Sequence, residues 1–196
     1  TGVASAAQPV PGHSKLVPDV PRTSMPRVTT CEIVDLEYIG DRVFVVGTFT
    51  SLRNNTSNNT TTVNQRYVAS FNLVTGLIDT NFRPTFDSTV NAIEASPDGT
   101  KLYVAGKFNT VNGVTKRKVA SINPTTGATV TGFTANANSA ATALEATNST
   151  VYIGGQFTTI NNTARASLAA VNANTGAVTS LRSDLSGGIG VNGLLT

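Results

Sequence analysis

Cysteine and histidine are nearly absent from this sequence. Its 196 residues include one cysteine, Cys31, and one histidine, His13. A single cysteine excludes a disulfide bond within the chain. Metal sites need clusters of His, Cys, Asp or Glu, so we expect no bound metal and no cofactor. A copper-radical oxidase would need histidine ligands outside the N-terminal tail, where none occurs.

Cys31 has three interpretations. The one that we favour is a buried thiol acting as a small apolar residue at the start of the first strand region. A disulfide to a cysteine outside this segment is the second. A catalytic thiol is the third, and it is disfavoured because His13 lies in a proline-rich tail and no Cys–His pair is indicated elsewhere.

Charged residues are also scarce, at 13% of the chain, with a formal net charge of +3. This bias is too small to predict a nucleic-acid partner, which requires a concentrated basic face. We interpret the basic run Lys116–Lys118 as a solvated turn, with a polyanion contact as the alternative. A surface of Thr, Asn and Ser suits extracellular bacterial proteins, so we expect a secreted protein or one on the bacterial cell surface.

No apolar run reaches the roughly 18 residues of a membrane helix, so we expect no membrane span in this segment. No G-x-S-x-G elbow or phosphate-binding G-x-G-x-x-G fingerprint follows a strand, and Gly187–Gly190 reads as a flexible loop. The acidic residues are scattered: Asp35, Glu37, Asp41, Asp79, Asp87, Glu94, Asp98, Glu145 and Asp184. Two of them could meet in the fold and serve glycoside hydrolysis, but we assign no catalytic, cofactor-binding or metal residues, and the ligand-binding residues stay unknown.

What the sequence does have is an internal repeat. Leu102-Tyr103-Val104-Ala105-Gly106-Lys107-Phe108 returns as Val151-Tyr152-Ile153-Gly154-Gly155-Gln156-Phe157, with an earlier copy at Val43–Phe49. Gly106 and Gly155 are separated by 49 positions, as are Phe108 and Phe157. A fixed period of roughly 20–50 residues predicts a solenoid, a propeller or an array.

Each copy holds four short segments rich in Val, Ile, Tyr, Phe and Thr and bounded by turn residues. The first segments begin at Ile33, Val90, Ala141 and Val191, and the fourth follow the Thr-Gly turns at Gly76, Gly127 and Gly176. This punctuation indicates strands without helices. We predict an all-β fold of β-propeller blades with four antiparallel strands each. Both faces of Leu102–Ala105 are apolar, which predicts burial between stacked blades. Gly47, Gly106 and Gly155 indicate a close backbone approach or a bulge.

Two sets of repeated side chains were candidates for ligand contacts. We interpret the aromatic set as core rather than as sugar-stacking platforms: Phe49, Tyr103, Phe108, Tyr152 and Phe157. The basic set, Arg66, Arg117 and Arg165, precedes the third strand in each copy. We expect these arginines to form a structural ion pair or hydrogen bonds to a neighbouring loop, with a ligand role as the alternative.

The first copy carries an insertion, Arg53–Asn64, which is rich in Asn and Thr. We expect Asn54–Asn64 to be an exposed, mobile polar loop, since it offers no apolar anchor. N-x-[ST] sequons occur at Asn54, Asn58, Asn148 and Asn161. They would accept glycans in a secreted eukaryotic protein, whereas in an Asn/Thr-rich bacterial protein they arise by chance, the reading that we prefer.

We divide the chain into a proline-rich extended tail, residues 1–30, and propeller repeats over residues 31–196. Ala4-Ser5-Ala6 resembles the end of a signal peptide. The repeats cover residues 33–89, 90–140 and 141–190, with a partial copy at 191–196. This gives three blades and the first strand of a fourth. Because propellers close with about four to eight blades, we expect a longer native chain with neighbouring domains, or assembly of several copies. Alone, these residues should be oligomeric, poorly soluble or marginally stable.

The pattern Tyr103-Val104-x-Gly106-x-Phe108-x-x-Val111-Asn112-Gly113, followed by Arg117, Ala120 and Thr126-Gly127, resembles the delta-60 type β-propeller repeat of secreted and surface-attached bacterial proteins. The resemblance spans roughly residues 31–196 and brings no catalytic residues. It implies a non-catalytic module that binds or scaffolds, with a protein or glycan ligand. The alternative is the propeller domain of an extracellular enzyme, such as a polysaccharide-active hydrolase or oxidase.

Overall fold

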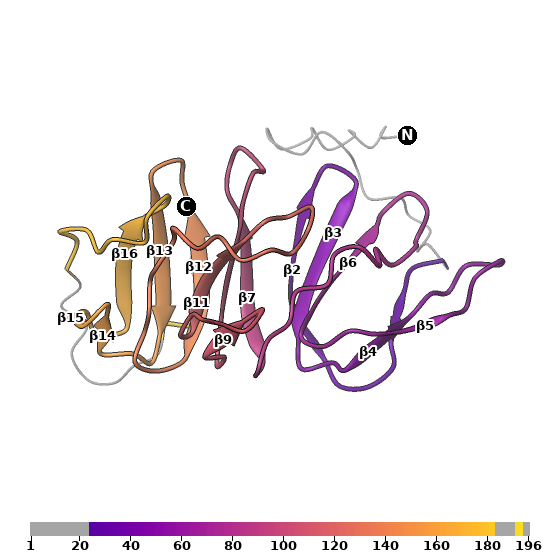
Figure 1. Ribbon diagram of the computed structural model, residues 1–196, viewed down its shortest axis with the longest axis horizontal. Helices are drawn as coiled ribbons and strands as arrows, with labels where there is room; N and C mark the ends of the chain where they lie inside the picture. The colour runs from indigo at the N-terminus through magenta and orange to yellow at the C-terminus, as the bar shows by residue number, and fades with distance from the viewer. Residues whose placement is uncertain (1–23, 183–190, 194–196) are drawn as a thin grey trace, which may run out of the picture.

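Three antiparallel sheets stand in a row in the computed structural model, which describes residues 24–182 and 191–193 (Figure 1). All sixteen elements of the described residues are strands, as the sequence predicted. The first sheet has the order β2 (Ile33–Ile39), β3 (Arg42–Gly47), β6 (Val68–Asn72). The second has β7 (Val90–Ala95), β8 (Leu102–Gly106), β11 (Val119–Ile122). The third has β12 (Ala141–Ala146), β13 (Thr150–Gly155), β16 (Leu168–Asn172).

The fourth segment of each copy is present but makes no strand. After its Thr-Gly turn it contributes one isolated bridge per sheet, Phe71↔Ile78, Ile122↔Thr129 and Val171↔Val178. The sheets therefore have three strands where the sequence predicted four. Each turn is held by an asparagine, Asn72, Asn123 or Asn172, whose side-chain oxygen accepts two backbone N–H groups.

A second small sheet accompanies each large one. In the second and third copies it is a two-stranded hairpin, β9 (Thr110–Val111) with β10 (Val114–Thr115) and β14 (Thr159–Ile160) with β15 (Thr163–Ala164). In the first copy β4 (Ser51–Arg53) and β5 (Thr62–Asn64) form a longer hairpin. It gains a third strand from β1 (Arg27–Val28), which lies inside the predicted tail.

The long hairpin corrects the prediction of a purely polar loop. Leu52 and Val63 are buried in one apolar cluster with Val43, Val45 and Phe49. Asn54 is buried as well, and its Oδ1 accepts the backbone N–H of Ile78 at 2.8 Å. Within Asn54–Asn64 the exposed residues are Ser57 and Asn58 at the tip and, on the returning side, Thr60, Thr61, Thr62 and Asn64. The missed anchor was Val63, because alternation over three residues is too short to be recognised within an Asn/Thr run.

Successive sheets pack face to face. We call the side of a sheet that looks toward the preceding sheet its leading face, and the opposite side its trailing face. Phe44, Val46 and Val68 on the trailing face of the first sheet share one core with Ile93 and Val104 on the leading face of the second. Tyr103, Ala105 and Val119 repeat this arrangement against Leu144 and Ile153 of the third. Every residue of β8 is buried, so the predicted burial of both faces is confirmed.

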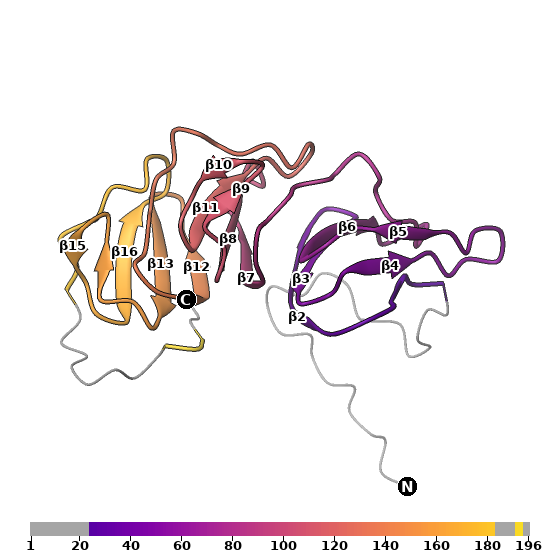
Figure 2. The same cartoon turned by 60° about the horizontal axis from the view of Figure 1, so that its bottom comes forward.

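The first strands β2, β7 and β12 contact one another in sequence along the row (Figure 2). Each is bulged at its second residue, where the register shifts. Opposite each bulge lies Gly47, Gly106 or Gly155, where an added Cβ would come within 2.0–2.4 Å of a backbone oxygen. The predicted close approach is therefore confirmed, and no side chain fits there.

Hydrogen bonds at the bulges join each first strand to the next. Asp35 Oδ2 accepts from Ile93 N at 2.9 Å, and Asn91 Nδ2 donates to the carbonyl of Ala141 at 3.2 Å. Thr142 Oγ1 donates in the same way to the carbonyl of Val191 at 2.7 Å. Val191 thus stands to the third sheet as Ala141 stands to the second, although Val191–Gly193 form no strand.

Several predictions fall outside the described residues: the Ala4-Ser5-Ala6 site, His13, Asp184 and the Gly187–Gly190 loop. Within the described residues the row of sheets is open, and it does not fix the number of blades. None of these residues forms a helix of the length and apolar character needed to cross a membrane.

Candidate functional site

The repeated aromatic residues are structural. Phe49, Tyr103, Phe108 and Phe157 are fully buried, which confirms the core interpretation. Tyr103 packs against Phe133 with 5.4 Å between ring centroids, and its hydroxyl donates to the carbonyl of Ala173 at 2.8 Å. Tyr152 is the exception, because it is only half-buried on the trailing face of the third sheet.

The repeated basic position is one residue away from where the sequence analysis placed it in two copies. Arg66 and Arg117 are exposed, whereas the residues three before β6, β11 and β16 are buried. Those residues are Gln65, Lys116 and Arg165. The sequence held the information for aligning the copies correctly, because Lys116 lies eight positions after Phe108 and Arg165 lies eight positions after Phe157.

All three buried side chains reach backbone carbonyls of the segment that leaves their sheet. Gln65 Nε2 donates to the carbonyl of Pro84 at 2.8 Å, and Arg165 Nη2 to that of Thr179 at 2.7 Å. Lys116 Nζ donates to the carbonyls of Thr131 and Phe133. Burial lowers the pKa of Lys116. The solvated-turn prediction is therefore wrong for Lys116, while the expected loop hydrogen bonds are found for Arg165.

Cys31 is exposed, so the prediction of a buried thiol is wrong. The residue lies at a bend just before β2 with φ at 69°, a conformation that turns the backbone sharply. Cys31 lies next to the first sheet of the row, and no other large sheet of the described residues precedes that sheet. An apolar side chain at this place therefore finds no partner to pack against.

Three glutamates occupy the same place on the three first strands. Glu37 pairs in register with Phe44, Glu94 with Tyr103 and Glu145 with Tyr152. Because β2, β7 and β12 are neighbours, these carboxylates form a row, with Asp35 beside Glu37. The sequence contained the signal, since a glutamate directly follows each of the three first-strand motifs, but the acidic residues were read as scattered.

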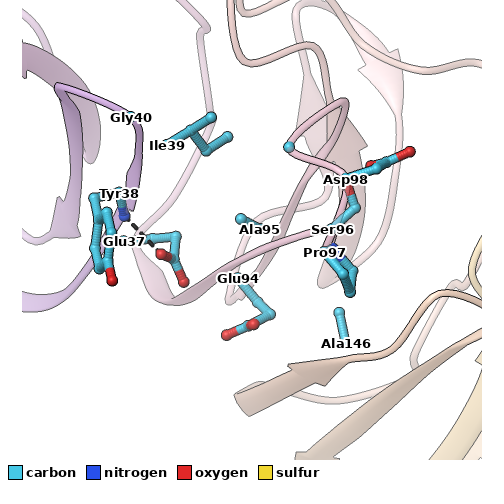
Figure 3. A pocket seen from close by; sticks show the side chains of 11 residues that line it. Glu37, Tyr38, Ile39, Gly40, Glu94, Ala95, Ser96, Pro97, Asp98 and Ala146 are labelled. Carbon is cyan, nitrogen blue, oxygen red and sulfur yellow. Dashed lines mark hydrogen bonds between the residues drawn. The ribbon is translucent and has the colours of Figure 1, made fainter. Parts of the chain in front are cut away.

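An open hollow of about 460 Å³ lies between the end of β2 and the turn from β7 to β8. Figure 3 shows Glu37 and Glu94 on opposite sides of this space, with Asp98 on the turn above and Ala146 of the third sheet below. Glu37 Oε1 accepts the backbone N–H of Tyr38 at 2.6 Å. The fold thus brings together residues 57 positions apart in the chain.

The carboxyl groups of the hollow differ in charge. Burial, and then the nearby Glu37, Glu145 and Asp35 carboxylates, raise the pKa of Glu94 to about 8. Burial also raises the pKa of Glu37, against backbone hydrogen bonds that lower it. Hydrogen bonds from Ser96 and Thr100 lower the pKa of Asp98 to about 2. Near neutral pH the hollow therefore offers both a protonated carboxyl and carboxylates, which can donate and accept hydrogen bonds.

Two other acidic residues serve the fold. Asp79 forms an ion pair with Arg42. Asp87 Oδ1 accepts the N–H groups of Asn109 and Thr110 at 2.8 and 3.0 Å. In the part of the chain that the structure describes, no group of three or more His, Cys, Asp or Glu side chains is arranged to hold a metal ion.

The sequons differ in accessibility. Asn58 and Asn148 are exposed on a hairpin tip and a strand turn. Asn54 is buried, and Asn161 bonds through its side chain to Asn136 N and to the carbonyls of Thr134 and Gly176. A glycan on Asn54 or Asn161 would break these bonds, whereas Asn58 and Asn148 are exposed acceptor positions.

Residues 68–191, more than half of the chain, match the protein family described as the Rax2 C-terminal β-propeller domain. No curated protein matches significantly. Among solved structures, the crystal structure of the computationally designed Ika4 protein is similar, with a TM-score of 0.53 and 17% sequence identity. The match covers 85% of this chain and 80% of that one, and at this identity it supports the fold alone.

Proposed function

This chain belongs to the Rax2 C-terminal β-propeller domain family, and from this premise we propose that it is a non-catalytic module for binding or scaffolding. The observation that carries the proposal is the hollow with its row of equivalent glutamates. Most other repeated polar side chains bond to the protein's own backbone, whereas Glu37, which also accepts the N–H of Tyr38, and Glu94 line the open hollow. We place the module outside the cell, secreted or on a bacterial surface, because its charged content is low and its polar residues are largely Thr, Asn and Ser.

The ligand would be a glycan or a protein segment that presents hydroxyl or amino groups. Carboxylates accept hydrogen bonds from such groups, and the protonated Glu94 can donate one.

The repeat pattern supports assignment to the delta-60 type within the propellers, built as blades whose fourth strand is reduced to a bridge. Arrays of defined glycans and of peptides, probed with the whole chain, test this proposal.

The matched variants are Glu37→Gln with Glu94→Gln, against Glu32→Gln, an exposed carboxylate that does not line the hollow. Binding should fall at least tenfold for the double variant, as expected for the loss of hydrogen bonds to charged groups, and stay unchanged for Glu32→Gln. Binding that survives the double variant would place the ligand elsewhere and remove the basis of the proposal.

The second candidate is a polysaccharide-active hydrolase. One observation favours it: a carboxyl that keeps its proton at neutral pH faces a second carboxyl across an open hollow, the pair of groups that glycoside hydrolysis uses. Release of reducing ends from a panel of polysaccharides, abolished in both Glu94→Gln and Glu37→Gln, would establish it. Turnover by wild type that neither variant changes would exclude this site as catalytic.

A further inference from the structure

On the leading face of the first sheet β2 is exposed, whereas the equivalent strands of the other two sheets are buried; Val43 and Val45 of β3 on the same face are covered by the long hairpin. Leu36, Ile93 and Leu144 occupy the same register position on β2, β7 and β12. Ile93 and Leu144 are 3% and 7% exposed, because the preceding sheet covers them, whereas Leu36 is 59% exposed. Tyr38 is 68% exposed, and its equivalent in the third sheet, Ala146, is buried.

The first sheet also differs from the other two in exposure at the rim, by which we mean the start of the Thr-Gly turn that follows the third large strand of each sheet. Leu73, Pro124 and Ala173 each follow the asparagine of the Thr-Gly turn. Pro124 and Ala173 are buried, whereas Leu73 is 38% exposed. Ile33, Leu36, Tyr38 and Leu73 therefore form a leading surface with the pattern of a buried interface, and large exposed apolar patches mark sites of association.

The two interfaces between successive sheets of the chain show which contacts a leading surface makes with the sheet before it. In each, a side chain on the trailing side donates a hydrogen bond to the rim carbonyl of the next sheet. Arg42 Nη1 donates to the carbonyl of Pro124 at 2.7 Å, and Tyr103 hydroxyl to that of Ala173 at 2.8 Å. Lys101 Nζ adds a bond to Asn174 Oδ1 at 2.7 Å.

The third sheet carries the matching trailing surface. Tyr152 occupies the position of Tyr103, and Leu168 that of Val119. Both are only half-buried, whereas Tyr103 and Val119 are fully buried. Thr142 and Gly154 already hold Val191, the equivalent of Ile33, so this edge accepts an apolar residue at the start of a first strand.

We propose that the leading surface of the first sheet docks onto the trailing surface of the third sheet of a second copy of this chain, so that copies associate head to tail. Leu36 of one copy then packs as Ile93 packs on the first sheet, and Ile33 displaces Val191 of the other copy from its place beside Thr142 and Gly154. The hydroxyl of Tyr152 donates to the carbonyl of Leu73 of the other copy. The interface is heterologous, so each copy uses two different surfaces.

The test measures the mass of the whole chain by sedimentation velocity and light scattering over a roughly hundredfold range of concentration. The wild type should grow beyond the monomer as concentration rises. Leu36→Asp and Tyr152→Asp should each stay monomeric, because a buried unpaired charge opposes docking. Val114→Asp changes another exposed apolar residue, on the hairpin of the second copy of the repeat, and should associate like wild type.

Mixing the two aspartate variants tests the head-to-tail arrangement. Each keeps one intact surface, so an equimolar mixture should form dimers and stop there. Tyr152→Phe keeps the ring and loses the hydroxyl, and should weaken association about threefold to tenfold, the usual effect of one neutral hydrogen bond. Thermal melting of each monomeric variant separates lost docking from lost folding. If Tyr152→Asp does not fold, the test rests on Leu36→Asp, because Leu36 is exposed and its substitution should leave the fold intact.

Three results would overturn the proposal. The wild type could remain monomeric at every concentration, which would leave the leading surface to a different partner. Leu36→Asp could associate as wild type does. Finally, the mixture could fail to form dimers while both folded variants are monomeric, which would rule out a head-to-tail contact between these two surfaces.

Discussion

The first sheet and the two that follow it carry the same residue pattern but bury different amounts of it. The first strands of all three are bulged at the same position and place a glutamate at the same register position. Yet Ile93 and Leu144 are buried and Leu36 is exposed. The pattern therefore encodes which face of a strand is apolar, whereas burial depends on whether another sheet lies against that face.

The small hairpins of the three copies also differ in which apolar residues they cover. In the second and third copies, Val111 and Ile160 join cores shared with the preceding sheet. The hairpin of the first copy is longer, and Leu52 and Val63 cover Val43 and Val45 of its own sheet. The insertion thus shields β3 but leaves Leu36 and Tyr38 of β2 exposed on the leading face.

The largest expected effect concerns the trailing tyrosines. Tyr103→Ala should cost about 3–5 kcal/mol of the free energy of unfolding, because it empties a fully buried ring site. Tyr152→Ala should cost clearly less, since its ring is half-exposed. Tyr103→Phe, which removes only the bond to Ala173, should cost about 0.5–1.5 kcal/mol. Urea unfolding measures all three, and equal losses for Tyr103→Ala and Tyr152→Ala would refute the difference between the two sheets.

The leading positions give the next effect. Ile93→Ala should destabilise by about 2–5 kcal/mol, the range for a buried aliphatic residue. Leu36→Ala should change stability by less than about 0.5 kcal/mol in dilute samples, because it is a surface substitution. A large cost for Leu36→Ala in a strictly monomeric sample would mean that something in the same chain covers β2.

The hairpin of the first copy should divide into a structural base and a dispensable tip. Deleting Asn54–Asn64 should cost about 2–3 kcal/mol, because Val63 leaves the core and the buried N–H of Ile78 loses its acceptor. Replacing Ser57 and Asn58 by glycines should have little effect. Calorimetric melting compares the two, and an unchanged melting temperature after the full deletion would restore the original interpretation of a polar loop.

The smallest effect is on pH dependence. The folded-state pKa of Glu94, about 8, lies above its unfolded value, so the folded state retains a proton that the unfolded state releases. Stability should therefore fall as pH rises from about 4.5 to 8 and level off above the folded pKa. Glu94→Gln should remove part of this slope and be more stable than wild type near pH 8. Melting temperatures across this range, with Glu32→Gln as control, provide the measurement, and an unchanged slope in Glu94→Gln would assign the pH dependence to other groups.

The local structure of each copy follows from its own residues. Short β-rich segments, Thr-Gly turns held by asparagine and the glycines at 47, 106 and 155 act within a few residues or between adjacent strands. For this reason the all-β class, the repeat and the buried aromatic residues could be predicted. The row of glutamates and the buried Gln65, Lys116 and Arg165 could also have been predicted, since both follow from a correct alignment of the copies.

The partner that each sheet face packs against depends instead on how the sheets stack. The exposure of Cys31 and Leu36, the anchoring of the hairpin by Val63 and the shared hollow between Glu37 and Glu94 depend on sheets that are far apart in the sequence. A period of two residues along a strand tells apolar from polar sides, but it carries no information on the neighbour that covers them. The raised pKa of Glu94 likewise arises first from burial and then from carboxylates on β2 and β12, which become its neighbours only when the sheets stack.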